Sequence, residues 1–102
     1  MGDDAIEKLS EEQIADALGA YPRWSEIGGQ ITRTFEFDDF LGSMAFVNKV
    51  AEYAERVQHH PDILIRYNKV TLTVSTHDAG GITVKDFELA ENANQFAEQP
   101  AV

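Results

Sequence analysis

The chain has 102 residues, no cysteine, and a formal net charge of −10 from 18 acidic against 8 basic residues. This length predicts one hydrophobic core and a single domain spanning residues 1–102. The lack of cysteine excludes disulfides and thiolate metal sites. Because the negative charge repels phosphate groups, neither nucleic acid nor an anionic membrane surface is an expected partner.

Two sequence features bear on location. No apolar run approaches the roughly 18 to 20 residues that span a bilayer. The start, Met1-Gly2-Asp3-Asp4, lacks the basic-then-apolar pattern of a signal peptide. A cytoplasmic location is therefore expected.

The first half of the chain predicts a helix, a β-hairpin and a longer helix. Ser10 with Gln13 has the form of a capping box, so a short helix should begin there and stop near Gly19. Residues 24–27 and 30–37 have β-like patterns separated by a Gly-Gly pair, which predicts the hairpin. The longer helix is predicted from apolar residues at helical spacing, namely Phe40, Met44, Phe46, Val47, Val50, Ala51, Ala54 and Val57.

The second half predicts another hairpin and a last helix. Pro61 disfavours helical geometry at the residue before it, so the long helix should end near Gln58 or His59. Residues 63–67 and 70–76 are rich in β-branched side chains and flank a turn at residues 68–69. A loop at 78–81 precedes a helix capped by Thr83.

The resulting order, α-β-β-α-β-β-α, predicts the fold class. Hairpins rather than crossovers join the strands, which favours a four-stranded antiparallel sheet with helices packed on one face, an α+β fold. The aromatic residues expected in its core are Trp24, Phe35, Phe37, Phe40 and Phe46.

All three histidines fall within one stretch of the chain. His59 and His60 follow the long helix, and His77 follows the last predicted strand. Imidazole exchanges protons near neutral pH, so such a cluster suits general acid–base catalysis. Pattern alone favours structural roles for these histidines, a helix cap for the His59-His60 pair and a strand end for His77.

A longer motif surrounds the histidines. Glu55-x-x-x-His59-His60-Pro61 is followed after five residues by Tyr67, after nine more by His77 and after eight more by Asp86. This spacing resembles the signature of the pterin-4a-carbinolamine dehydratases, also called 4a-hydroxytetrahydrobiopterin dehydratases. The predicted order of elements is also similar to that family's fold.

The resemblance implies a lyase that dehydrates 4a-hydroxytetrahydropterin to quinonoid dihydropterin and so recycles tetrahydrobiopterin-type cofactors. It implies that His59 and His77 alternate as acid and base, that His60 positions the substrate, and that Glu55 orients a histidine. No metal and no organic cofactor is expected, because the reaction needs only proton transfer and a held geometry. The remaining candidate substrate-binding residues are Pro61, Asp62, Ile63, Ser75, Thr76 and Asp78.

The sequence predicts a specific role for each of three further residues in this region. Ile63 stands where many members of the family have Trp, so an aromatic wall against the pterin is missing and weaker affinity is expected. Asp86 is expected to serve the first turn of the last helix. Tyr67 is expected to pack within a strand.

Alternatives remain at this point. Members of the family also act as dimerisation partners of a transcription factor, which makes a non-catalytic binding module on the same fold the main rival. A three-histidine zinc site is a second rival, disfavoured because adjacent histidines generally project in different directions. The resemblance also implies a homodimer or homotetramer, and residues 70–76 are a candidate edge strand for pairing between subunits.

Overall fold

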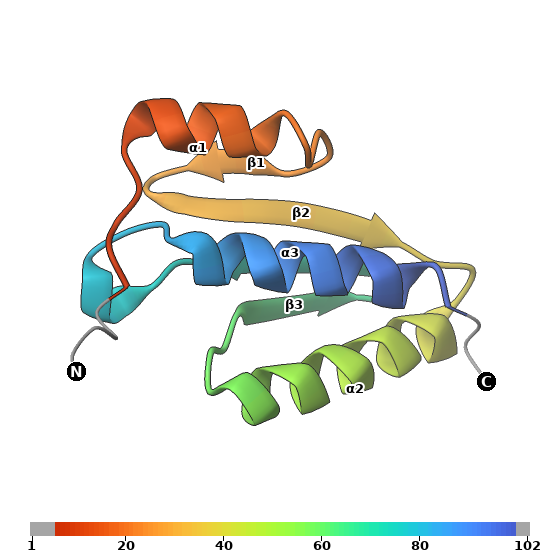
Figure 1. The fold of residues 1–102 in the computed structure, drawn as a ribbon. Helices are drawn as coiled ribbons and strands as arrows, with labels where there is room; N and C mark the ends of the chain where they lie inside the picture. The colour runs from red at the N-terminus through yellow and green to blue at the C-terminus, as the bar shows by residue number, and fades with distance from the viewer. Residues whose placement is uncertain (1–5, 100–102) are drawn as a thin grey trace.

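The computed structural model describes residues 6–99 and has the predicted order of elements. One four-stranded antiparallel sheet has the strand order β1-β2-β4-β3, and the helices lie on one of its faces (Figure 1). The predicted α+β fold class is therefore confirmed. The elements are α1 (Glu11–Leu18), β1 (Ser25–Ile27), β2 (Gln30–Glu36), α2 (Phe40–Val57), β3 (Asp62–Arg66), β4 (Lys69–Val74), a 3₁₀ turn (His77–Ala79) and α3 (Val84–Ala97).

The two central strands explain why the helices pack on one face only. Alternate residues of β2 and β4 point toward the helices and are buried, as in the register pairs Ile31 with Val74 and Phe35 with Val70. Their neighbours in sequence point to the other face, which carries threonine pairs such as Thr34 with Thr71. This alternation of apolar and polar residues gives the sheet one covered and one uncovered face.

Residues next to each end of α2 determine where the helix begins and ends. The Asp39 side chain caps the helix by accepting a hydrogen bond from the Gly42 N–H at 2.8 Å. At the other end, Gln58 adopts a left-handed conformation with φ 55°, which stops the helix after Val57. The helix therefore ends at the residue before the predicted boundary.

The second hairpin differs from prediction at its turn. The strands are connected by Tyr67-Asn68 rather than by residues 68–69, because the strands end at Arg66 and resume at Lys69. Tyr67 lies in this turn with φ 54° and is 64% exposed, so the expectation that it packs within a strand is wrong. Its carbonyl oxygen accepts a hydrogen bond from the buried Ser43 hydroxyl at 2.7 Å, which ties the turn to α2.

The proposed intersubunit pairing through residues 70–76 is also wrong. Strand β4 lies between β2 and β3, and it is hydrogen-bonded on both sides. The edges of this sheet are β1 and β3. Strand β4 would be an edge strand if the four strands paired in chain order. It pairs instead with β2 as well as with β3, which leaves β3 at the edge.

The aromatic core is mostly as predicted. Trp24, Phe35 and Phe46 are buried and Phe37 is half-buried, whereas Phe40 is 48% exposed at the first position of α2. The prediction for Phe40 is therefore wrong, because the buried side of α2 begins only at Ser43, almost one turn later. Within residues 6–99, no helix is both long and apolar enough to span a membrane.

The strained turn at Tyr67 yields a stability prediction. We expect Tyr67→Gly to raise the free energy of unfolding by about 0.5 to 1 kcal/mol, because glycine adopts positive φ without the steric cost that a β-carbon imposes. The measurement is urea denaturation followed by circular dichroism. The neighbouring strand substitution Arg66→Gly should instead lower stability by about 0.5 to 1 kcal/mol, and a loss of stability in Tyr67→Gly would contradict the turn geometry.

Candidate functional site

The three histidines line one open cavity of about 260 Å³ at the end of the sheet where α2 finishes and α3 begins. Two chain segments that are distant in sequence, one after α2 and one after β4, supply most of its wall. The structure therefore brings His77 together with the His59-His60 pair around a shared hollow. The complete lining is Gln58, His59, His60, Ser75, Thr76, His77, Asp78 and Lys85.

The end of α2 places the first two histidines. The left-handed conformation of Gln58 turns the chain, and the His59 N–H still donates to the Ala54 carbonyl at 3.0 Å. Because Pro61 disfavours continuation of a helix, the chain then leaves extended into β3. His59 is thereby held against the protein while His60 points outward, with side-chain exposures of 11% and 53%.

A tight loop after β4 places the third histidine. Thr76 forms a bridge with Gly81, with the Thr76 N–H donating to the Gly81 carbonyl at 2.8 Å. The residues between them make a single 3₁₀ turn that starts at His77 and closes at Gly80, where φ is 78°. The predicted loop is thus short and hydrogen-bonded, and it leaves His77 exposed at the cavity.

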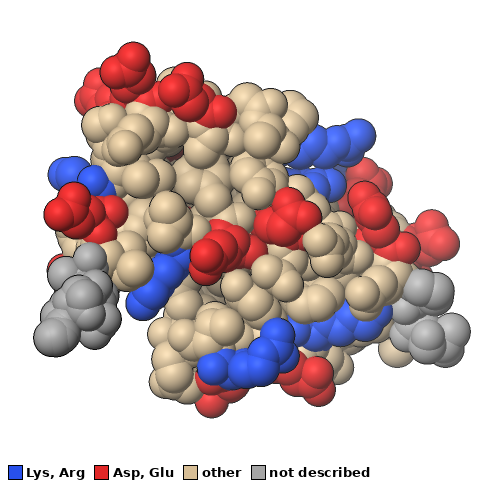
Figure 2. Space-filling view, in the orientation of Figure 1, with Lys and Arg blue, Asp and Glu red and all other residues tan. Residues whose placement is uncertain are grey.

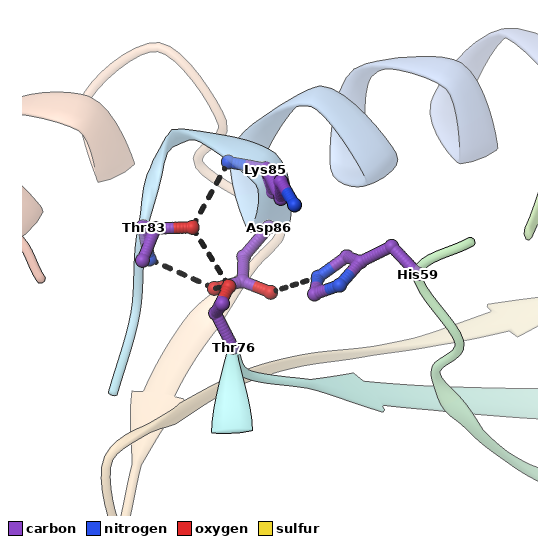
Figure 3. A network of polar contacts seen from close by, with 5 residues as sticks. All are labelled: His59, Thr76, Thr83, Lys85 and Asp86. Atoms are coloured by element: carbon purple, nitrogen blue, oxygen red, sulfur yellow. Dashed lines mark hydrogen bonds and ion pairs between the residues drawn. The ribbon is translucent and has the colours of Figure 1, made fainter. Parts of the chain in front are cut away.

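A buried carboxylate holds His59 in place (Figure 3). Asp86, in the first turn of α3, is fully buried, and its Oδ1 lies 2.7 Å from Nε2 of His59. Its Oδ2 accepts from the Thr76 hydroxyl at 2.9 Å and from the Thr83 N–H at 2.8 Å. The predicted helix-capping role of Asp86 is correct but incomplete, because the same carboxylate also binds His59.

The hydrogen-bond donors in this network determine where protons lie. The Thr83 hydroxyl accepts from the Lys85 N–H and lies 2.7 Å from the Thr76 hydroxyl. Since the Thr76 proton goes to Asp86, the Thr83 hydroxyl donates to Thr76. An ionised Asp86 is an acceptor only, so Nε2 of His59 carries a proton and Nδ1 is the ring nitrogen left to exchange one.

His60 has a partner of a different kind. Its Nε2 lies 2.6 Å from Oε2 of Glu55, one turn back on α2, as the signature spacing allows. Both side chains are largely exposed, Glu55 by 72%, so solvent screens this pair strongly. The contact fits an orienting role for Glu55, whereas the His59–Asp86 pair is the structural anchor.

The remaining candidate substrate-binding residues divide into two groups. Ser75, Thr76 and Asp78 line the cavity, although the Thr76 hydroxyl is already engaged with Asp86. Three others lie nearby but outside the lining, namely Pro61, Asp62 and Ile63.

Sequence reasoning missed two lining residues, Gln58 and Lys85. Gln58 carries no chemical signal beyond its place before the histidine pair. Lys85 is one residue from Asp86, and its place in the first turn of the last helix was the available clue. In residues 6–99, no group of three or more metal-ligating side chains is arranged to hold a metal ion.

Comparison with known proteins identifies the family of this chain. The family described as Pterin 4 alpha carbinolamine dehydratase matches residues 7–96. The chain belongs to this family. A Cyanothece protein named as a candidate pterin-4-alpha-carbinolamine dehydratase is 49% identical over 87% of this chain and 92% of its own. One with the same name from Acidobacterium capsulatum is 53% identical over 81% of this chain and 90% of its own.

Solved structures support the assignment to this dehydratase family. A transcriptional coactivator/pterin dehydratase from Brucella melitensis is 35% identical and superposes with a TM-score of 0.86 over 89% of this chain and 99% of its own. A pterin dehydratase-like protein described as a RuBisCO assembly factor in the alpha-carboxysome is 19% identical, with a TM-score of 0.62 over 76% of this chain and 90% of its own. This second likeness shows the fold alone.

The buried network yields a stability prediction. We expect Asp86→Asn to lower the free energy of unfolding by about 2 to 4 kcal/mol, because the amide brings two N–H groups into a pocket of donors and weakens the bond from His59. The measurement is urea denaturation, with the histidine ring ¹⁵N shifts reporting the His59 tautomer. The exposed cavity residue provides a matched control, since Asp78→Asn should change stability by less than about 0.5 kcal/mol. Equal effects of the two substitutions would contradict the buried role of Asp86.

Proposed function

We propose that this protein is a 4a-hydroxytetrahydrobiopterin dehydratase, a hydro-lyase that converts 4a-hydroxytetrahydropterin to quinonoid dihydropterin and water. The observation that carries the proposal is the convergence of His59, His60 and His77 on one cavity, with His59 anchored by a buried carboxylate. Membership of the dehydratase family supports the same reaction. Such a protein recycles tetrahydrobiopterin-type cofactors, and we place it in the cytoplasm.

The reaction needs one proton delivered and one removed. The C4a–O bond breaks as the N5 lone pair forms a C4a–N5 double bond, so an acid must protonate the departing hydroxyl while a base takes the N5 proton. His59 and His77 come to the cavity from opposite chain segments and can serve the two ends of this transfer. Because one imidazole loses a proton and the other gains one, the net charge of the site is unchanged.

His60 and the loop residues then have positioning roles. Glu55 orients the His60 ring toward the substrate, and Ser75 and Asp78 offer polar groups at the cavity wall to the pterin edge. Pro61, Asp62 and Ile63 follow His60 but are not part of the lining, so we assign them to the rim of the cavity. Ile63 in place of the Trp of many relatives is expected to raise KM more than it lowers kcat, since it removes only an apolar face.

The protein is further proposed to be a homo-oligomer. Strand β3 is an open edge of the sheet, and it exposes Ile63 by 37% and Leu64 by 57%. An unpaired apolar edge strand is a template for pairing with a second copy, which would extend the sheet. Because β3 begins two residues after His60, a dimer formed there would also bury the rim of the cavity.

The catalytic assignment predicts large losses of turnover. We expect His59→Ala and His77→Ala each to lower kcat for dehydration of 4a-hydroxytetrahydropterin by about 10² to 10⁴, the usual contribution of a general acid or base. His60→Ala should act mainly on KM. The measurement is a stopped-flow ultraviolet assay, with the exposed helix substitution Glu52→Gln as the control expected to retain wild-type rates.

The same assay distinguishes a dehydratase from the rival function, a non-catalytic binding module. Wild-type turnover in all three histidine variants would contradict the assignment. A folded wild-type protein with no turnover but a specific protein partner would favour the binding module, a role named for the Brucella coactivator/dehydratase.

The oligomer proposal has its own test. We expect Leu64→Lys to shift the protein to a monomer in light scattering after size-exclusion chromatography, because a charge on an edge strand opposes pairing. The matched control is Leu41→Lys on α2, which is 74% exposed. Dissociation by the α2 substitution alone would place the interface on the helix and contradict pairing through β3.

A further inference from the structure

A second cavity lies at the end of the sheet away from the histidines, between β2, the segment after α1 and the last turns of α3. Its volume is about 590 Å³, and two arginines, Arg23 and Arg33, line it. The protein as a whole is acidic, and Figure 2 shows several separate groups of acidic side chains on one face, with fewer basic ones between them. Two cations at one cavity are therefore unusual here. The remaining lining residues are Tyr21, Pro22, Thr34, Phe35, Glu36, Phe37, Asn94, Ala97 and Glu98.

Arg33 is held in place by direct contacts with uncharged groups. It projects from the helix-covered face of β2, and its guanidinium carbon lies 4.0 Å from the centre of the Phe35 ring. Its Nη1 donates to Oδ1 of Asn94 at 2.6 Å, and the same oxygen accepts from the Trp24 indole N–H at 2.9 Å. A neutral amide oxygen thus satisfies one of the five guanidinium N–H groups, and the other donors remain for a ligand.

The two arginines share the lining of the cavity with two carboxylates, those of Glu36 and Glu98. Burial is the main cause that lowers the pKa of Arg33, and the positive charge of Arg23 lowers it further, while Glu98 partly opposes both. In residues 6–99, neither arginine forms an ion pair with a carboxylate at direct contact distance. Within the described residues, both arginines therefore keep N–H donors that no carboxylate engages directly.

We propose that this cavity binds a phosphate-type oxyanion between Arg23 and Arg33. Arginine presents a planar fork of N–H donors that matches two oxygens of a tetrahedral anion, and the Phe35 and Asn94 contacts keep the Arg33 fork in a fixed orientation. The site is independent of the histidine cavity and of the proposed dehydration. It is thus a candidate second ligand site on a protein whose overall charge repels anions elsewhere.

The test uses a reporter that the chain supplies. Trp24 is the single tryptophan, and its indole N–H shares the Asn94 oxygen with Arg33, so its ¹H–¹⁵N resonance reports directly on the site. We expect a saturable shift of this resonance on titration with sodium phosphate and none with sodium chloride at equal ionic strength. The same response to both salts would overturn the proposal.

Removing a positive or a negative charge from the cavity should change its phosphate affinity in opposite directions. Arg23 is exposed, so Arg23→Gln should leave the fold intact and weaken phosphate binding about tenfold, the value of one charge-assisted contact. Glu98→Gln removes a competing carboxylate and should strengthen binding about twofold to threefold. The remote control Arg56→Gln, in the last turn of α2 at the histidine end of the protein, should change affinity by less than about twofold, because screening removes its influence. Unaltered binding in Arg23→Gln would contradict the site.

Discussion

The bond between the buried carboxylate of Asp86 and the ring of His59 is the contact on which the candidate active site depends. It joins the start of α3 to the end of α2, which are separated in sequence by both strands of the second hairpin. A fully buried carboxylate is tolerated only when donors surround it, and the Thr76 hydroxyl, the Thr83 N–H and the His59 ring supply them. The network that completes the fold at this corner therefore also fixes the orientation of the histidine.

This arrangement divides the site into a rigid and an adaptable half. His59 is almost covered and bonded to a buried group, whereas His60 and His77 are exposed. A covered, hydrogen-bonded histidine beside two exposed ones is consistent with a substrate that enters from solvent and is then positioned. If β3 pairs with a second copy, the exposed half would become more enclosed, since that strand continues from the His60-Pro61 segment.

Much of the fold followed from local sequence signals. The Ser10 capping box, the helical spacing from Phe40 onward and the break before Pro61 each act over a few residues, and the structure has the corresponding elements. The sequence-based predictions failed where the conformation or exposure of a residue depends on its tertiary contacts. The exposure of Phe40, the left-handed turn at Tyr67 and the central place of β4 depend on what packs beside them, which a single sequence does not state. For the site, the histidine cluster was visible, but the second role of Asp86 needed the spatial neighbour His59.

The central claim is that His59 and His77 act on the reacting edge of a pterin held in their shared cavity. The most direct measurement is a crystal structure with a bound dihydropterin. The account predicts that the C4a and N5 edge lies within hydrogen-bond reach, about 2.6 to 3.2 Å or one water away, of Nδ1 of His59 and a ring nitrogen of His77. A pterin bound elsewhere on the protein, with this cavity empty at saturating ligand, would contradict it.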